Sequence, residues 1–349
     1  MKKKYNLCYD ILTILACLMV VFFHTNGVLY TYSNSLSWKI SAVERCIVYS
    51  AIPIFFMLSG AKLLDYRKRY STKEYAKKRL LRVGIPFVFW NIFYVIFQRV
   101  FTPEASFHSV KEFFSMLLNS EFQGRYWFFF PLFAVYAAIP VISLVLQAEN
   151  HRKYLWYAVY TVFALNWVLQ PVCGLLGISY NSYLTMPVSG GFLVYVLFGY
   201  LVSTEQWGRP KRIVLYSLAV ASGIFAAAHI IRTSAAMETT VIAMASYQFF
   251  PSALTGAAIF VFVKHIFDKP SVAAFWQRQE KLTKLTRTVS GCCMGVWLTH
   301  SLGILLGGSI LGLSSSGYLY RFALPFLVFI ACVFGVWIVK KIPVLQHIV

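Results

Sequence analysis

Long apolar runs recur from one end of this sequence to the other and constrain its fold more than any other feature. A helix needs about 20 apolar residues to cross the roughly 30 Å hydrocarbon core of a bilayer. Only helices suit these runs, because the sequence lacks the period-two alternation of membrane barrels. We therefore expect an all-α polytopic integral membrane protein with about ten transmembrane helices, forming one membrane-embedded domain over residues 1–349. The runs are residues 7–30, 43–64, 83–101, 126–147, 154–174, 189–203 (which is short and needs its flanks), 213–231, 241–263, 289–312 and 319–339.

The basic residues lie in the connections between these runs, and they alternate in density. One set of connections holds 25 Lys and Arg residues; the set that alternates with it holds 7, and together these are all 32 in the chain. The positive-inside rule places the richer set, which includes both ends of the chain, in the cytoplasm. Because the basic residues lie in these short connections, the positive-inside rule accounts for the net charge of +20, and no nucleic acid partner is expected. The richer set is the N-terminus and residues 62–82, 152–153, 209–212, 264–287 and 340–341.

The seven cysteines are scattered, lie mostly inside apolar runs and show no C-x-x-C spacing. This pattern indicates packing residues and argues against a disulfide framework or a zinc site, so no metal is expected. The P-loop, G-x-S-x-G and H-E-x-x-H signatures of soluble enzymes are also absent.

Polar residues inside spanning helices are costly, so they are functional candidates by default. The first run contains Asp10, His24 and Asn26, and the ninth contains His300. At 1.5 Å per residue, His24 lies about 25 Å beyond Leu7, in the outer half of the membrane. A histidine there could accept a proton from a hydroxyl as a general base. The alternative is a histidine that only forms hydrogen bonds between packed helices.

Two charged groups near the ends of runs have alternative interpretations. Lys78, Arg79 and Arg82 precede the third run, where they could grip the phosphates of a cofactor; they could also only fix topology and attract anionic lipids. Arg125 and Trp127 open the fourth run, as an interfacial anchor or as a platform for a sugar.

Several ordered blocks resemble the acyltransferase-3 family of bacterial membrane proteins. The resemblance covers the whole chain, and the ordered set of blocks is more specific than any single block. The blocks are the first run from Asp10 to His24, the segment 52–60 (IPIFFMLSG), the segment 77–86 (KKRLLRVGIP) followed by Trp90, the segment 126–128 (YWF) with Pro140, the segment 296–300 (VWLTH) and the ending 341–343 (KIP).

The resemblance implies a ten-helix enzyme that moves an acyl group, commonly acetyl, from cytoplasmic acyl-CoA to a hydroxyl of an envelope glycan. The family's key histidine would be His24, and its phosphate-facing arginines would be Arg79 and Arg82. The sequence departs from the family at Thr13, where an arginine is usual, and at residues 124–126, where a histidine often precedes the W-F block.

The leading hypothesis is thus an O-acyltransferase of the bacterial plasma membrane that uses acyl-CoA, expected to be acetyl-CoA, as co-substrate. Its partners would be membrane lipid and an envelope glycan acceptor, with a homodimer or glycan-synthesis proteins as further candidates. A transporter or flippase for a lipid-linked glycan is the alternative, and a non-catalytic subunit of a glycan synthase is a third interpretation. The expected site comprises catalytic His24, Asp10 and His300, cofactor-binding Lys78, Arg79 and Arg82, and substrate-binding Asn26, Glu44, Arg45, Arg125 and Trp127.

Overall fold

The computed structural model describes residues 6–101, 109–184, 186 and 190–349. These residues form helices and no strand, so the all-α membrane prediction is confirmed. Within this part of the chain, nine helical stretches are long and apolar enough to cross a bilayer. The expected sixth crossing is α10 (Leu193–Thr204), an apolar helix of only 12 residues. The count of ten and the cytoplasmic termini stay predictions, and Lys2, Lys3 and Lys4 lie outside the described residues.

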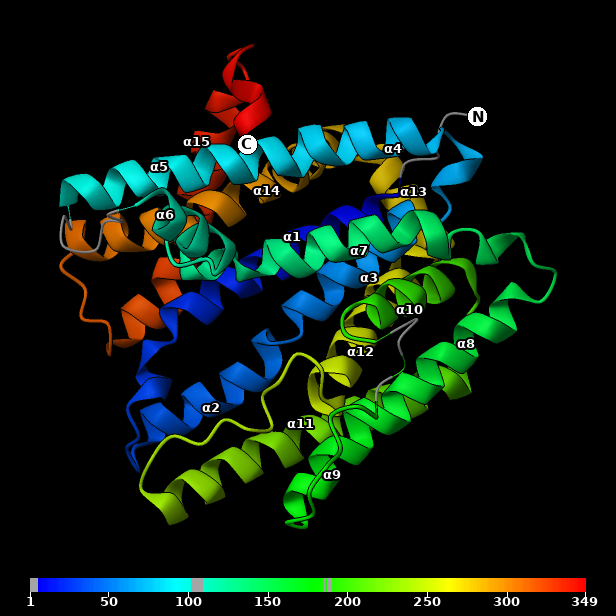
Figure 1. Cartoon of the computed structure of the whole chain (residues 1–349), viewed down its shortest axis with the longest axis horizontal. Coiled ribbons are helices and arrows are strands. Elements are labelled where there is room, and N and C mark those ends of the chain that lie inside the picture. The colour runs from blue at the N-terminus through cyan, green and yellow to red at the C-terminus, as the bar shows by residue number, and fades with distance from the viewer. Residues whose placement is uncertain (1–5, 102–108, 185, 187–189) are drawn as a thin grey trace.

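The described residues form α-helices, π-helical segments and 3₁₀ turns, and Figure 1 labels the α-helices. The α-helices are α1 (Leu7–Thr25), α2 (Leu36–Val48), α3 (Ala51–Leu63), α4 (Thr72–Arg79), α5 (Ile85–Phe101), α6 (Val110–Leu118), α7 (Phe129–Ile142), α8 (His151–Val162), α9 (Gln170–Leu175), α10, α11 (Arg209–Met237), α12 (Phe250–Phe267), α13 (Pro270–Arg278), α14 (Glu280–Ile310) and α15 (Leu324–Val339). Three π-helical segments are η3 (Leu80–Gly84), η7 (Phe163–Leu169) and η8 (Leu319–Ala323). Short 3₁₀ turns are η1 (Gly27–Tyr30), η2 (Tyr66–Lys68), η5 (Gly124–Phe128), η6 (Val145–Gln147) and η9 (Leu345–Ile348).

Two helices differ in their bounds from the apolar runs. The second run, 43–64, is divided by a break at Tyr49 and Ser50 between α2 and α3. Its helix begins earlier, because the Ser35 hydroxyl accepts a hydrogen bond from the Trp38 amide and caps α2. The run 241–263 becomes helical only at Phe250, where Pro251 occupies the first turn and needs no N–H partner.

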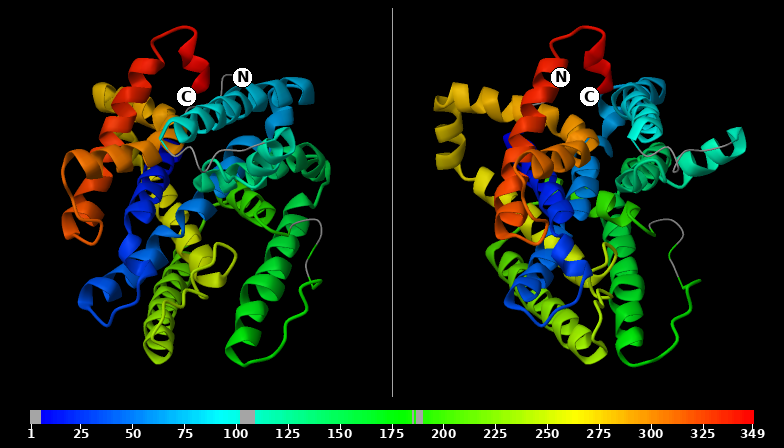
Figure 2. Two further views of the ribbon diagram at one scale, coloured as in Figure 1. Left: turned by 60° about the vertical axis from the view of Figure 1, so that its left-hand side comes forward. Right: turned by 90° about the vertical axis from the view of Figure 1, so that its left-hand side faces the viewer.

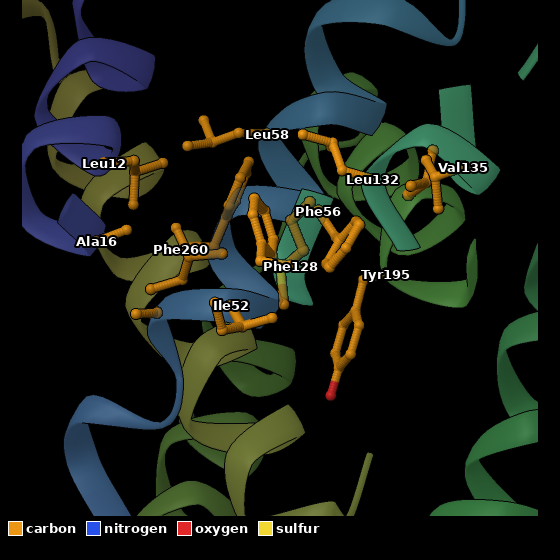
Figure 3. Packing of buried hydrophobic residues seen from close by; sticks show 14 of the residues in the cluster. Leu12, Ala16, Ile52, Phe56, Leu58, Phe128, Leu132, Val135, Tyr195 and Phe260 are labelled. Carbon is orange, nitrogen blue, oxygen red and sulfur yellow. The ribbon is translucent and has the colours of Figure 1, made fainter. Parts of the chain in front are cut away.

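The core of the bundle forms where α1 packs against α3, α12, α14 and α15. Figure 3 shows Leu12 and Ala16 of α1 beside Ile52 and Phe56 of α3, with Phe260 of α12 between them. The tightest crossing joins α3 to α10. A Cβ atom at Gly60 would overlap the carbonyl of Val196, and one at Gly199 would overlap the backbone of Met57. These glycines let the two backbones touch.

Figure 2 shows which elements lie at the two ends of the molecule. Helix α4, helix α5 and the C-terminal η9 lie at its upper end. Helix α2 and the C-terminal end of α11 lie at the opposite end. The end of the chain packs against α5, where the Trp90 indole donates to the Ile348 carbonyl at 2.8 Å.

Candidate active site

A cavity of about 470 Å³ opens among α1, α3, η3, α7 and α14. Its wall carries five basic side chains and one acidic side chain, so it is strongly electropositive. The basic residues are Lys62, Arg69, Arg79, Arg82 and Arg287, and the acid is Asp10. We call this space the cationic cavity. A concentration of guanidinium groups suits a ligand with several phosphates, because each group can form two parallel hydrogen bonds.

Local sequence brings Arg79 and Arg82 to this wall. The Ser71 hydroxyl caps α4 by accepting a hydrogen bond from the Glu74 amide at 3.3 Å. The helix then widens into η3 just before Pro86. Pro86 lacks the N–H that would bond to the Arg82 carbonyl in a regular α-helix, which favours the wider turn at this position. Lys78 does not line the cavity; it is exposed and forms an ion pair with Glu74 at 2.7 Å.

Asp10 lies on the wall of the cationic cavity and not beside His24. Fourteen residues of helix separate the two side chains, which is about 21 Å along the axis. The Ser290 hydroxyl of α14 donates to Asp10 Oδ1 at 2.7 Å, while Oδ2 is buried without a partner among the described residues. Next to it, Lys62 Nζ donates to the Thr13 hydroxyl at 3.1 Å.

His24 and His300 meet between α1 and α14, with ring centroids 5.1 Å apart. His300 is fully buried, and its Nδ1 lies 2.7 Å from the Trp297 carbonyl and 3.2 Å from that of Val296. A carbonyl only accepts, so Nδ1 carries the proton and Nε2 of the neutral ring is an acceptor. This Nε2 is buried and has no partner within the described residues.

His24 lines a second, much smaller space, of about 10 Å³, which we call the histidine pocket. This volume holds about one water molecule. Its wall also includes Trp127, Tyr247 and Trp297. Trp297 lines the cationic cavity as well, so its indole ring belongs to the walls of both spaces.

The outer residues form an aromatic and cationic group beside the histidine pocket. The Arg45 guanidinium lies over the rings of Phe23 and Tyr49, at 4.5 and 4.0 Å from their centroids. Tyr49 stacks on Tyr247 with centroids 4.1 Å apart. Tyr247 in turn stacks on Trp127 at 5.2 Å. This ladder fixes Arg45 and Trp127 relative to each other.

The remaining expected residues take different roles. Glu44 forms an ion pair with the fully buried Arg321 at 3.4 Å, and the Asn26 amide donates to the Ser41 carbonyl at 3.0 Å. Both contacts join helices. The other side-chain oxygen of each residue, Glu44 Oε1 or Asn26 Oδ1, is buried without a partner among the described residues. Arg125 is half-buried, and its charge acts on both histidines.

Sequence reasoning missed several residues of this site. Their contacts cross helices that are far apart in the sequence. The block 296–300 contains Trp297 but indicates no role for it, and Arg321 lies in one of the connections with few basic residues. The missed residues are Lys62, Arg69, Arg287, Ser290, Tyr247, Trp297 and Arg321.

Comparison with known protein families gives the site its context. A family model described as an acyltransferase domain matches residues 6–340. The chain belongs to the acyltransferase-3 family. The matched range includes all the residues that line the two cavities. The resemblance predicted from the sequence is therefore confirmed, and the chain is a membrane acyltransferase. Searches of curated proteins and of solved structures gave no match.

The part of the chain that the structure describes contains no group of three His, Cys, Asp or Glu side chains that could bind a metal ion.

Proposed function

We propose that the protein is an O-acyltransferase of the bacterial plasma membrane. It moves an acyl group, expected to be acetyl, from cytoplasmic acyl-CoA to a hydroxyl of an envelope polysaccharide or lipid-linked sugar. The observation that carries this proposal is the shared wall. A cavity lined by five basic residues and the histidine pocket share the Trp297 indole as a lining side chain.

The cationic cavity suits the nucleotide end of acyl-CoA. Its diphosphate and 3′-phosphate would meet Arg79, Arg82 and Arg287, which approach from α4, η3 and α14. Planar guanidinium groups bind phosphate bidentately. The pantetheine arm would then extend along α1 toward His24, over the roughly 21 Å that separate Asp10 from that ring.

His24 is the proposed general base. It accepts the proton of the acceptor hydroxyl while the hydroxyl oxygen attacks the thioester carbonyl. The C–S bond then breaks, and the departing thiolate takes the proton back from the imidazolium. His300 orients this ring, since its own Nδ1 is fixed by the Trp297 carbonyl.

The acceptor would approach from the opposite side. Trp127 and Tyr247 offer aromatic edges at the histidine pocket, and Arg125 supplies a donor for sugar hydroxyls. Aromatic side chains with a polar group nearby are the usual lining of small-molecule sites.

Acyl transfer in proteoliposomes tests the general base. We expect His24→Ala to lower the rate of acetyl transfer from acetyl-CoA to envelope polysaccharide by about 10²–10⁴-fold. His265→Ala is the matched control, because that ring contacts Arg212 and lines neither cavity. Full activity of His24→Ala would show that another group is the base.

Ligand-induced stabilisation tests the donor. Acetyl-CoA at 100 times its Kd should stabilise the protein by about 2.7 kcal/mol. Acetyl-dephospho-CoA, which lacks the 3′-phosphate, should stabilise it less. A transporter of glycans would show no shift with either compound.

A further inference from the structure

Trp297 carries a buried hydrogen-bond donor that the protein itself does not use. The residue is 5% exposed, and its Nε1 has no acceptor among the described residues. Other tryptophans of the chain donate: Trp38 to the Leu29 carbonyl at 3.0 Å and Trp90 to the Ile348 carbonyl at 2.8 Å. A buried indole N–H usually finds such a partner.

Packing alone does not explain an indole at this position. The ring stacks on Phe128 with centroids 4.8 Å apart and meets Phe129 edge to face at 5.9 Å. A phenylalanine ring would serve these aromatic contacts without leaving a donor unpaired. The same contacts hold the indole in place, so its N–H is a fixed donor.

The location of this donor distinguishes it from other unpaired groups. Trp207 Nε1 is also buried without a partner in the described structure, but Trp207 lines neither cavity. Trp297 lines both, and its ring centroid lies 5.8 Å from that of His300. A thioester that reaches from the cationic cavity to His24 would lie beside this ring, because Trp297 lines both spaces.

We propose that the Trp297 N–H stabilises the oxyanion formed on the thioester carbonyl during acyl transfer. This role rests on the proposed acyltransferase function and adds a catalytic residue to it. As the acceptor oxygen bonds to the carbonyl carbon, the C=O electron pair moves onto oxygen and the hydroxyl proton moves to His24. Collapse of this intermediate restores the carbonyl, breaks the C–S bond and releases the thiolate, which takes the proton from His24.

A donor aimed at developing charge accelerates the chemical step more than it strengthens ground-state binding. Trp297 therefore differs from the basic residues of the cationic cavity, whose loss weakens acyl-CoA binding. It also differs from His24, which moves a proton.

The test is acetyl transfer by full-length Trp297→Phe in proteoliposomes, with acetyl-CoA and deacetylated envelope polysaccharide. We expect kcat to fall about 10²–10³-fold, the usual cost of losing one oxyanion donor, while acetyl-CoA affinity stays unchanged. Trp207→Phe, which removes an equally unpaired indole N–H elsewhere, should transfer at the wild-type rate. Replacing Trp297 with 3-benzothienylalanine, whose ring has sulfur in place of N–H, repeats the test without changing the shape of the ring.

The outcomes separate the two proposals. Wild-type kcat in both position-297 variants would overturn the role of Trp297 while leaving the acyltransferase intact. A lowered acetyl-CoA affinity with unchanged kcat would also overturn it. The absence of transfer by the wild-type protein under conditions where acetyl-CoA stabilises it would instead count against the proposed function.

Discussion

Thr13 and Lys62 meet across the interface of α1 and α3, on the wall of the cationic cavity. The Lys62 ammonium comes from the end of α3 and lies beside the position where the family usually carries an arginine on the first helix. A positive charge is therefore present at this part of the cavity although Thr13 is neutral. Lys62 thus supplies a positive charge next to Thr13 on the wall of the cationic cavity.

Removing this charge should weaken donor binding. We expect Lys62→Met to raise the Kd for acetyl-CoA about tenfold or more, because a hydrogen bond to a charged group contributes about 1.5–3 kcal/mol. Titration calorimetry in detergent would measure the change. Lys77→Met on the exposed part of α4 should bind acetyl-CoA as the wild type does. Equal affinities for the two variants would place the phosphates away from Lys62.

The Arg321–Glu44 pair is a structural contact at the other side of the bundle. Arg321 is fully buried, and it also donates to the Ser37 hydroxyl at 2.8 Å. Arg321→Met should lower the free energy of unfolding by about 3–5 kcal/mol, because it leaves the Glu44 charge buried without its partner. The double variant Glu44→Gln/Arg321→Met should lose less than the sum of the two single changes. Equilibrium unfolding in mixed micelles measures each value, and a strictly additive result would contradict the coupling.

Individual residues were predictable where the bilayer penalises them. Asp10, His24 and His300 stand out in apolar runs. Asp10 lines the cationic cavity, His24 lines the histidine pocket, and His300 lies against His24 without lining either space. Arg287 and Trp297 could not be assigned from sequence, because their roles depend on which face of α14 meets α1. Lys78 was predicted to bind phosphate from its type and position. In the structure it lies outside the cationic cavity and forms a surface ion pair with Glu74, four residues earlier.

At the scale of elements, all three π-helical segments end two residues before a proline. Segments η3, η7 and η8 end at Gly84, Leu169 and Ala323, and Pro86, Pro171 and Pro325 follow. In each case the carbonyl four residues before the proline lies inside the wide turn and would lack its α-helical partner. Those carbonyls belong to Arg82, Trp167 and Arg321. The exposed Arg82 lines the cationic cavity, and the buried Arg321 pairs with Glu44.

Restoring the missing N–H should regularise the turn. We expect Pro86→Ala to extend the α-helix through η3, rotate Arg82 away from the cationic cavity and raise the Kd for acetyl-CoA about tenfold. Pro210→Ala is the control, since Pro210 lies in the first turn of α11, where no N–H partner is needed. Unchanged acetyl-CoA affinity in Pro86→Ala would show that the wide turn does not position Arg82.

The crossing of α3 and α10 depends on two glycines. Gly199→Ala should destabilise the protein by about 1–3 kcal/mol or more, because the new methyl group overlaps the Met57 backbone and forces the helices apart. Gly335→Ala in α15 is the matched control, since nothing lies within 4 Å of its Cβ position. That variant should be neutral or slightly stabilised. Thermal unfolding in detergent compares them, and equal midpoints would contradict the close approach.

The apolar runs predicted the helices better than their ends. Most runs coincide with helices because spanning segments must satisfy their own backbone groups. The ends depend on local caps and breaks, such as Ser35 before α2 and the interruption at Tyr49, which apolar content does not reveal. Apolar content does not predict the π-helical segments either, although a proline follows each of them in the sequence.

For the whole molecule, the orientation in the membrane is the outstanding prediction. Ser33→Cys, in the exposed segment before α2, should react with a membrane-impermeant maleimide in intact cells. Lys281→Cys, exposed at the start of α14, should react only after the membrane is permeabilised. This result follows from the excess of Lys and Arg on the side of residues 62–82 and 264–287. The opposite labelling pattern would invert the topology.

The position of Trp297 in the walls of both cavities has a consequence for the membrane voltage as well as for acyl transfer. A bacterial membrane stores energy as a voltage, and each elementary charge that leaks through it dissipates about 2.3 kcal/mol per 100 mV. An enzyme with an aqueous entrance on each side risks becoming such a leak. Among the described residues, the histidine pocket has room for about one water molecule, and the buried Trp297 side chain lines both this pocket and the cationic cavity. Under the proposed reaction, such close packing would limit the leak of ions while the acyl unit crosses.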